Sequence, residues 1–145
     1  MENNMYIPKY FRLYELLPKD YYNENLINWY IFDNRLLFTL DKIREKFGLI
    51  VINDWFPGGT NQYRGWRPFD CKVGAKLSQH KFGRACDLIP IRCTPKEIRD
   101  DIMKNPLIED YKYITCIENF DNMSWVHIDC RNHNKEKNGL FIVKP

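Results

Sequence analysis

The feature that most constrains this fold is a helical stripe of apolar residues that leads directly into a short β-branched segment. Between Asn34 and Phe47 the apolar residues recur at helical spacing, and charged residues cover the opposite face. Asp33 or Asn34 is the candidate N-cap, and Gly48 is the candidate C-cap. Residues 49–54, LIVIND, then predict a buried strand. A helix followed at once by a buried strand predicts helices packed on a sheet.

The rest of the chain predicts an α+β domain with a small antiparallel sheet flanked by helices. Thr94, Pro95 and Glu97 have the pattern of a capping box, which predicts a helix over residues 94–104. Further strands are expected over residues 86–91, 113–118 and 125–130, with an edge strand in the final segment FIVKP. The long loop 55–77 is rich in aromatic and basic residues, and loops of this length are usually functional.

Length and composition limit the classes of protein that remain. A chain of 145 residues suits a single domain, here a motif-bearing core over 34–131 with an N-terminal extension, 1–33, packed on it. The net charge of +3 is too weak to predict a nucleic-acid partner, and no apolar run is long enough to span a membrane. The N-terminus lacks the pattern of a signal peptide, and five irregularly spaced cysteines indicate reduced thiols. We therefore expect synthesis in a cytoplasm.

Two short segments concentrate side chains that bind metals. In SQHKFGRACDL, His80 and Asp87 would lie about 10 Å apart on a helix, but a turn at Gly83 into a strand can bring them together. In WVHIDCR, His127 and Asp129 share one face of a strand. Two histidines and a carboxylate suit a catalytic zinc ion, which keeps one coordination position open for water.

The segment from Ser78 to Asp87 resembles the S-x-H-x-x-G-x-A-x-D motif of the zinc D-Ala-D-Ala carboxypeptidase-like peptidases, which have the Hedgehog/DD-peptidase fold. Downstream, Trp125-Val126-His127 is similar to the W-x-H element of that family. The resemblance covers residues 34–131 and is strongest to short phage-type members. It implies a Hedgehog/DD-peptidase-like fold. It also implies one zinc ion per chain, bound by His80, Asp87 and His127.

The resemblance further implies hydrolysis of peptide bonds in bacterial peptidoglycan, as in endolysins and other wall hydrolases. Zinc lowers the pKa of a bound water towards neutrality and polarises the scissile carbonyl, so the chemistry is consistent. The expected partners are the stem or cross-bridge peptides of the cell wall, and virion proteins are a further class. Such an enzyme would be made in the host cytoplasm and would act at the wall after release, or it would be carried in a virion.

The general base is the point where the sequence departs from part of the family. Many members place a glutamate three residues before the last histidine, where this chain has Ser124. If residues 113–118 and 125–130 form a hairpin, Glu118 lies beside His127 and is the predicted general base. Asp121 in the connecting turn is the competitor. The departure leaves a second hypothesis open, a catalytically inactive, zinc-stabilised binding or structural module, for instance in a virion.

Other candidate residues follow from the needs of the transition state. Its oxyanion requires a fixed donor, and family members place an arginine in the loop before the S-x-H motif; we favour Arg67 over Arg64. Asp129 is expected to accept a hydrogen bond from a ligand histidine, and a paired surface acid is its alternative role. The candidate substrate-binding residues are Ser78, Trp66 and Trp125. Loop capping is the alternative role for Ser78, and core packing is the alternative for the two tryptophans.

Overall fold

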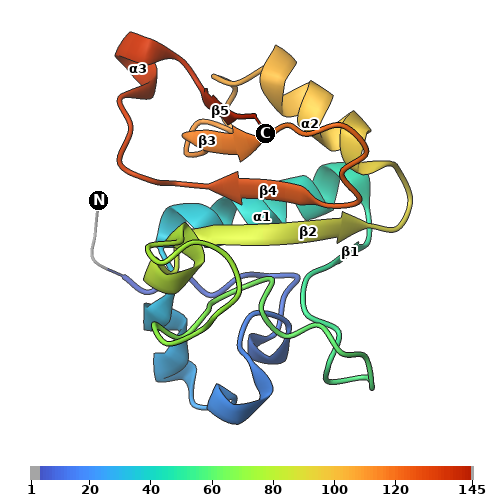
Figure 1. Ribbon diagram of the computed structural model, residues 1–145, viewed down its shortest axis with the longest axis vertical. Coiled ribbons are helices and arrows are strands. Elements are labelled where there is room, and N and C mark those ends of the chain that lie inside the picture. Colours follow the sequence, from blue (N-terminus) through green and yellow to red (C-terminus); the bar gives the residue numbers. More distant parts are fainter. Residues whose placement is uncertain (1–3, 145) are drawn as a thin grey trace.

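The computed structural model describes residues 4–144, which form a five-stranded sheet with its two longest helices on one face (Figure 1). The α+β prediction is confirmed. The strand order is β1-β2-β4-β3-β5. In chain order, the strands are β1 Ile50–Val51, β2 Ala85–Pro90, β3 Cys116–Glu118, β4 Val126–Asp129 and β5 Phe141–Val143. The helices are α1 Asn34–Phe47, α2 Pro95–Lys104 and α3 Lys135–Asn138, and the 3₁₀ turns are η1 Leu13–Glu15, η2 Lys19–Tyr21, η3 Leu26–Ile31 and η4 Gln79–Phe82.

One part of the sheet differs from the prediction. β1, β2, β4 and β3 pair antiparallel, as expected, but β5 pairs parallel with β3. The chain reaches β5 from β4 through α3, so it arrives at the far edge of β3 after reversing direction. The prediction of a purely antiparallel sheet is therefore wrong for this edge strand. Pro145, the last residue of the predicted FIVKP strand, lies outside the described residues.

Helix α1 has the bounds that its sequence signals predict. The Asp33 side chain accepts a hydrogen bond from the backbone N–H of Arg35, which makes Asp33 the N-cap. Gly48 ends the helix with a φ of 83°, a conformation that residues with a Cβ adopt at a cost. Four members of the apolar stripe, Leu36, Leu37, Leu40 and Ile43, are buried, and the fifth, Phe47, is half-buried at the end of the helix. Local capping and the apolar stripe together therefore fix this element.

The other predicted elements are present, and β1 and β3 are the strands shortened most relative to their predicted ranges. In α2 both hydrogen bonds of the capping box form between Thr94 and Glu97. β1 ends early because the backbone N–H of Asn53 donates to the carbonyl of Glu15, in the N-terminal segment. β3 begins late because the N–H of Ile114 closes a turn onto Tyr111. All five cysteines are free thiols.

The described part of the N-terminal extension, residues 4–33, packs on the core as predicted. Phe11, Leu16 and Leu17 belong to the same buried cluster as α1 and the sheet. Asp41 on α1 anchors the beginning of this segment, because its buried carboxylate accepts hydrogen bonds from the Tyr6 hydroxyl and from the N–H groups of Lys9 and Tyr10. Residues 1–3 lie outside the described part.

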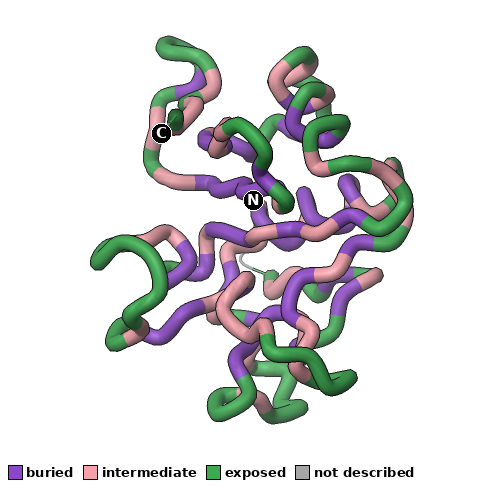
Figure 2. The backbone as a smooth tube through the Cα atoms, turned by 45° about the vertical axis from the view of Figure 1, so that its right-hand side comes forward, coloured by how far each residue is buried: buried purple, intermediate pink, exposed green. Residues whose placement is uncertain are grey.

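Burial follows the sheet. Buried stretches run along the central strands, and exposed stretches lie in the loops (Figure 2). The helices α1 and α2 lie behind the sheet in Figure 1, so the opposite face carries the loops and turns that surround the candidate site. Among residues 4–144, no helix has the length and apolar character needed to cross a membrane.

Candidate functional site

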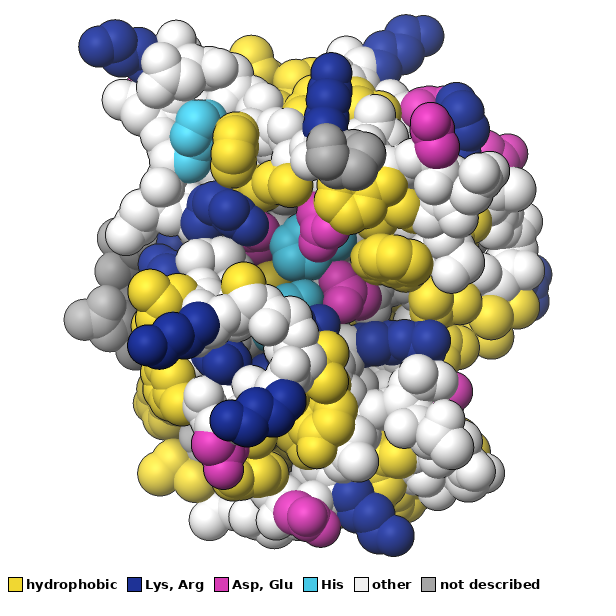
Figure 3. All heavy atoms as spheres, viewed as in Figure 1, with side chains coloured by type: hydrophobic (Ala, Val, Ile, Leu, Met, Phe, Trp, Pro, Cys, Tyr) yellow, Lys and Arg dark blue, Asp and Glu magenta, His cyan; other side chains and the backbone are white. Residues whose placement is uncertain are grey.

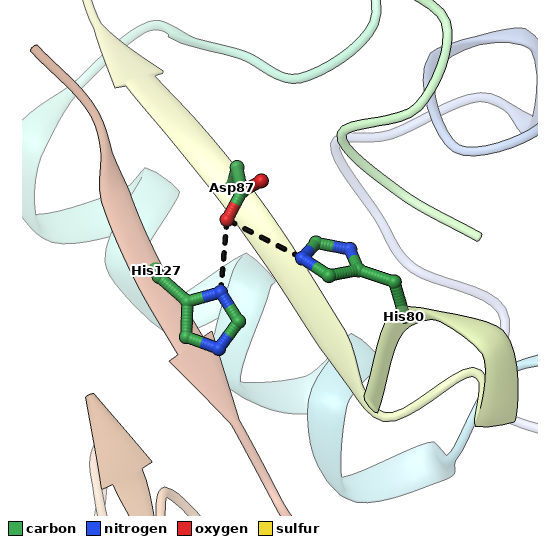
Figure 4. Close-up of side chains that lie close together, drawn as sticks. All are labelled: His80, Asp87 and His127. Carbon is green, nitrogen blue, oxygen red and sulfur yellow. Dashed lines mark hydrogen bonds and ion pairs between the residues drawn. The ribbon is translucent and has the colours of Figure 1, made fainter. Parts of the chain in front are cut away.

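Three side chains converge on the face of the sheet opposite α1 and α2. Asp87 on β2 and His127 on β4 are direct partners in the antiparallel register, so both side chains lie on the same face. His80 comes from η4, and Gly83, with a φ of 68°, turns the chain from η4 into β2. Asp87 Oδ1 lies 2.9 Å from His127 Nδ1 and 3.4 Å from His80 Nε2 (Figure 4). The ligand atoms of this group all lie within 4.8 Å of one another, and the group could hold a metal ion.

Each histidine ring is oriented by a partner on its other nitrogen. The Nδ1 of His80 lies 2.8 Å from the carbonyl oxygen of Gly65, which can only accept a hydrogen bond. The Nε2 of His127 lies 2.8 Å from Oδ2 of the fully buried Asp129, as the sequence predicts. These partners direct His80 Nε2 and His127 Nδ1 towards Asp87. Such supporting contacts are typical of metal-binding histidines, whose orientation they fix.

The charges at the site are strongly coupled. Burial alone would raise the pKa of Asp87, but hydrogen bonds from His127 and His80 hold that pKa well below its usual range. Burial would lower the pKa of His127, but its hydrogen bonds to Asp129 and Asp87 outweigh burial and raise the pKa to about 9. The metal-free site therefore keeps Asp87 ionised and His127 protonated at neutral pH. A cation bound at this site would displace that proton.

Several other predicted residues line one cavity with these three side chains. The cavity has a volume of about 450 Å³, and Glu118, Arg67, Ser78 and Trp125 are among the residues that line it. Glu118 Oε1 lies 3.1 Å from His127 Nδ1, and Arg67 Nη2 donates to Asp87 Oδ2 at 3.2 Å. Figure 3 shows histidine and acidic side chains gathered in this hollow, with basic side chains around it.

Ser78 also has the loop-capping role considered as its alternative, because its hydroxyl accepts a hydrogen bond from the N–H of His80. Capping of η4 and exposure to the cavity are compatible, because the hydroxyl can still donate its proton. Ser78 therefore helps to position His80 and also faces the space in which a ligand would lie.

The structure does not bring Arg64, Trp66 or Asp121 into this cavity. Arg64 donates from Nη1 to the carbonyl of Ile52, on the neighbouring strand segment. Trp66 donates to the carbonyl of Lys81 and packs edge-on against Tyr21. Asp121 is exposed in its turn. Among the described residues, none of these three belongs to the cavity lining, so Arg67 is the one of the two candidate arginines that lines the cavity, and Trp66 takes the packing role.

Sequence reasoning missed two basic residues that shape the site. Arg131 lines the cavity and grips Asp129 with Nε and Nη2, at 2.8 and 2.6 Å. Its signal was available, because Asp129 and Arg131 stand two residues apart and so share a face of extended chain. Lys81 is buried and donates to the carbonyls of Phe69 and Lys76, which holds the loop that forms one wall of the cavity. No local pattern marks Lys81 for that role.

Comparisons of the chain with models of protein families, with curated proteins and with solved structures find no match. The arrangement of these side chains and the motif in the sequence are therefore the two indications of function. That arrangement consists of two histidines and a carboxylate that could hold a metal ion, with a second carboxylate and an arginine in the same cavity.

Proposed function

We propose that the chain is a zinc-dependent peptidase, with a Hedgehog/DD-peptidase-like fold, that hydrolyses peptide bonds of bacterial peptidoglycan. The observation that carries the proposal is the position of Glu118, whose carboxylate lies 3.1 Å from the ligand nitrogen of His127 inside the cavity. A metal site used only for stability needs no such second carboxylate. The S-x-H-x-x-G-x-A-x-D motif and the W-x-H element support the same class of enzyme.

The chemistry of the donors favours zinc, and two of their separations are compatible with it. Zinc bonds of about 2.0–2.1 Å in a tetrahedron separate the ligand atoms by ~3.3 Å. The separations from Asp87 Oδ1 are 2.9 Å to His127 Nδ1 and 3.4 Å to His80 Nε2, which are close to that value. Two imidazoles and one carboxylate are also a ligand set typical of catalytic zinc, which keeps a fourth position open. We therefore assign one zinc ion per chain to His80, Asp87 and His127.

The residues of the cavity have separate roles in the proposed reaction. When bound, zinc supplies a Lewis acid that acidifies water and polarises a carbonyl group. Glu118 is the general base, which takes a proton from the attacking water onto a carboxylate oxygen and delivers it to the leaving amine. The Arg67 guanidinium is held by the carbonyl of Tyr63 and by Asp87, so it can stabilise negative charge that develops on the substrate without reorganising.

The substrates in this proposal are the stem or cross-bridge peptides of the cell wall. The enzyme would reach them after release from the host cytoplasm, as endolysins do, or as a component of a virion. The competing hypothesis is an inactive, zinc-stabilised binding or structural module, which the serine at position 124 favours. The placement of Glu118 in the cavity favours the peptidase.

The proposal is tested by digesting purified peptidoglycan of several wall types with and without a chelator, and identifying the released ends by mass spectrometry. New amino termini that disappear with the chelator are expected. Glu118→Gln should keep zinc and lower the rate by about 10²–10⁴-fold, whereas Asp121→Asn, its matched control, should keep the wild-type rate. Intact walls throughout, from protein that carries one zinc per chain, would favour the binding module instead.

A further inference from the structure

Arg131 differs from the other arginine of the cavity in how its donors are used. All the donor nitrogens of Arg67 are engaged, with Nε on Tyr63, Nη1 on Val73 and Nη2 on Asp87, and its side chain is only 9% exposed. Arg131 uses Nε and Nη2 on Asp129, and within the described chain its Nη1 has no hydrogen-bond partner. Its side chain is 29% exposed and lines the cavity. Arg131 therefore presents a fixed positive charge to the cavity, with Nη1 free to donate hydrogen bonds.

Two neighbouring side chains hold the guanidinium group of Arg131 in place. The bidentate contact with Asp129 fixes the plane of the guanidinium, and the ring of Phe141 on β5 lies 5.6 Å from its central carbon. Val143, also on β5, continues the cavity wall beside it. A guanidinium fixed in advance loses little side-chain entropy when it binds a planar anion. This immobilisation distinguishes Arg131 from the flexible lysines of the surface.

The charge balance of the cavity favours an anionic ligand. Three carboxylates, those of Asp87, Glu118 and Asp129, face the two guanidinium groups. A divalent ion bound to the proposed ligands would leave the cavity with a net positive charge. Two further lysines, Lys72 and Lys76, are exposed in the loop whose neighbouring residues form the cavity wall.

Arg131 lies apart from the residues that are proposed to bind the metal. Its partner Asp129 contacts His127 at Nε2, whereas the metal-facing nitrogen of that ring is Nδ1. Arg131 therefore lies on the side of the His127 ring that faces away from Asp87 and His80. A substrate group that reaches Arg131 would be some distance from the bond that is cut.

We propose that Arg131 is a specificity-determining residue that binds a carboxylate of the substrate peptide, away from the scissile bond. This inference rests on the proposed peptidase function and adds that the preferred peptides are anionic. Two carboxylates of a peptidoglycan stem peptide have this chemistry, the one on its glutamate residue and the one at its C-terminus. A charge-assisted hydrogen bond to either contributes roughly 10–100-fold in affinity.

The test measures peptide binding in the Glu118→Gln variant loaded with zinc, by calorimetry, so that no turnover is required. The probes are a synthetic stem pentapeptide and two analogues, in which either the glutamate carboxylate or the terminal carboxylate is replaced by an amide. One of the two amides is expected to bind at least tenfold more weakly than the parent peptide, and that amide identifies the carboxylate that Arg131 recognises.

Arg131→Gln in the same background should bind the parent peptide and that amide equally, with zinc content unchanged. Arg131→Lys keeps the charge and should retain part of the discrimination. Arg35→Gln is the matched control, because Arg35 makes the same bidentate contact with an aspartate two residues earlier, Asp33, and does not line this cavity. It should discriminate like the unmodified background.

Equal binding of all three peptides to the protein with native Arg131 would overturn the inference, and so would the absence of binding by any of them. Discrimination that persists in Arg131→Gln, or that is lost in Arg35→Gln, would also overturn it. These outcomes do not depend on hydrolysis. A peptidase that cleaves walls but ignores the amide substitutions would therefore refute only the role of Arg131.

Discussion

The two sides of the candidate site are built differently. Asp87 and His127 stand on the paired strands β2 and β4, where the ladder sets their separation and the alternation of side chains sets their face. His80 and Arg67 come from the 3₁₀ turn η4 and the long loop before it, where no ladder positions them. One side is thus fixed by regular hydrogen bonding, and the other depends on irregular contacts.

Those irregular contacts come largely from the N-terminal segment. The N–H of Trp66 donates to the carbonyl of Leu16, the carbonyl of Gly83 accepts from the N–H of Asp33, and the N–H of Arg67 donates to the carbonyl of His80. The segment before α1 is therefore part of the scaffold that holds one metal ligand. A ligand on a strand is thus positioned by its own ladder, whereas a ligand on a loop needs contacts with distant parts of the chain.

The largest expected effect is loss of zinc binding, and it should be equal on the two sides of the site. His80→Ala from the loop side and His127→Ala from the strand side should each weaken zinc binding by about 10³-fold, because zinc loses one of three protein ligands. Equilibrium dialysis with zinc analysis measures this loss. His133→Ala is the control, since His133 contacts the carbonyl of Gly139 and does not belong to the group that could hold a metal. Zinc affinity unchanged in either ligand variant would contradict the ligand assignment.

The next largest effect concerns the loop side alone. At Gly83, with a φ of 68°, an added Cβ would lie 1.9 Å from the carbonyl oxygen of Ile31. Gly139 has a similar φ of 74°, and there nothing lies within 4 Å of an added Cβ. Gly139→Ala should therefore cost about 1–3 kcal/mol of unfolding free energy from backbone strain alone, because its ψ is −176°, a combination that residues with a Cβ rarely adopt. Gly83→Ala should cost about 3 kcal/mol, because the backbone must also move.

Chemical denaturation of the metal-free proteins measures both changes, and zinc titration measures the consequence for the site. Gly83→Ala should bind zinc more weakly because its shift displaces η4 and His80, whereas Gly139→Ala should bind zinc normally. Normal zinc affinity in Gly83→Ala would show that the contact with Ile31 does not fix the loop side.

A smaller effect is expected on the strand side. Asp129→Asn keeps the shape of the side chain but removes the carboxylate that accepts from His127 Nε2. Zinc affinity should fall by about 10–100-fold, the usual cost of losing a supporting partner of a ligand histidine. Competition with a chromogenic chelator measures this change. Wild-type affinity in Asp129→Asn would mean that β4 alone orients the ring.

The smallest expected effect is the release of a proton from His127 when zinc binds. The pKa of His127 in the metal-free protein is about 9, so His127 carries a proton at pH 7 that zinc must displace. Zinc binding should release about one proton at pH 7, and zinc affinity should rise with pH until about pH 9. Calorimetry in two buffers of different ionisation enthalpy counts the released protons. A binding enthalpy independent of the buffer would contradict the raised pKa.

The parts of the fold that follow from local signals were predictable from the sequence. The cap at Asp33, the apolar stripe and Gly48 define α1 without reference to the rest of the chain. The strands that carry Asp87 and His127 were likewise predictable, but their pairing was not, because the pattern of a strand does not specify its neighbour in the sheet. The convergence of His80 with Asp87 followed from the expected turn at Gly83, and the resemblance joined His127 to them as one ligand set.

Features that depend on distant contacts were not predictable in this way. The parallel pairing of β5 follows from the path of the chain through α3, which no periodicity encodes. Trp66 lies in the aromatic loop expected to form the site, but its packing against Tyr21 and Lys81 takes it out of the cavity. Arg131 had a usable signal in its spacing from Asp129, which gains meaning only once Asp129 is known to support His127.

The most direct test of the account is a nitrogen NMR measurement of the three histidine rings in ¹⁵N-labelled protein, before and after one equivalent of zinc. The account predicts that zinc binds His80 through Nε2 and His127 through Nδ1, because Gly65 and Asp129 occupy the other nitrogens. His133 should not change. Coordination of both rings through the same type of nitrogen, or rings that do not respond to zinc, would contradict the proposed metal site.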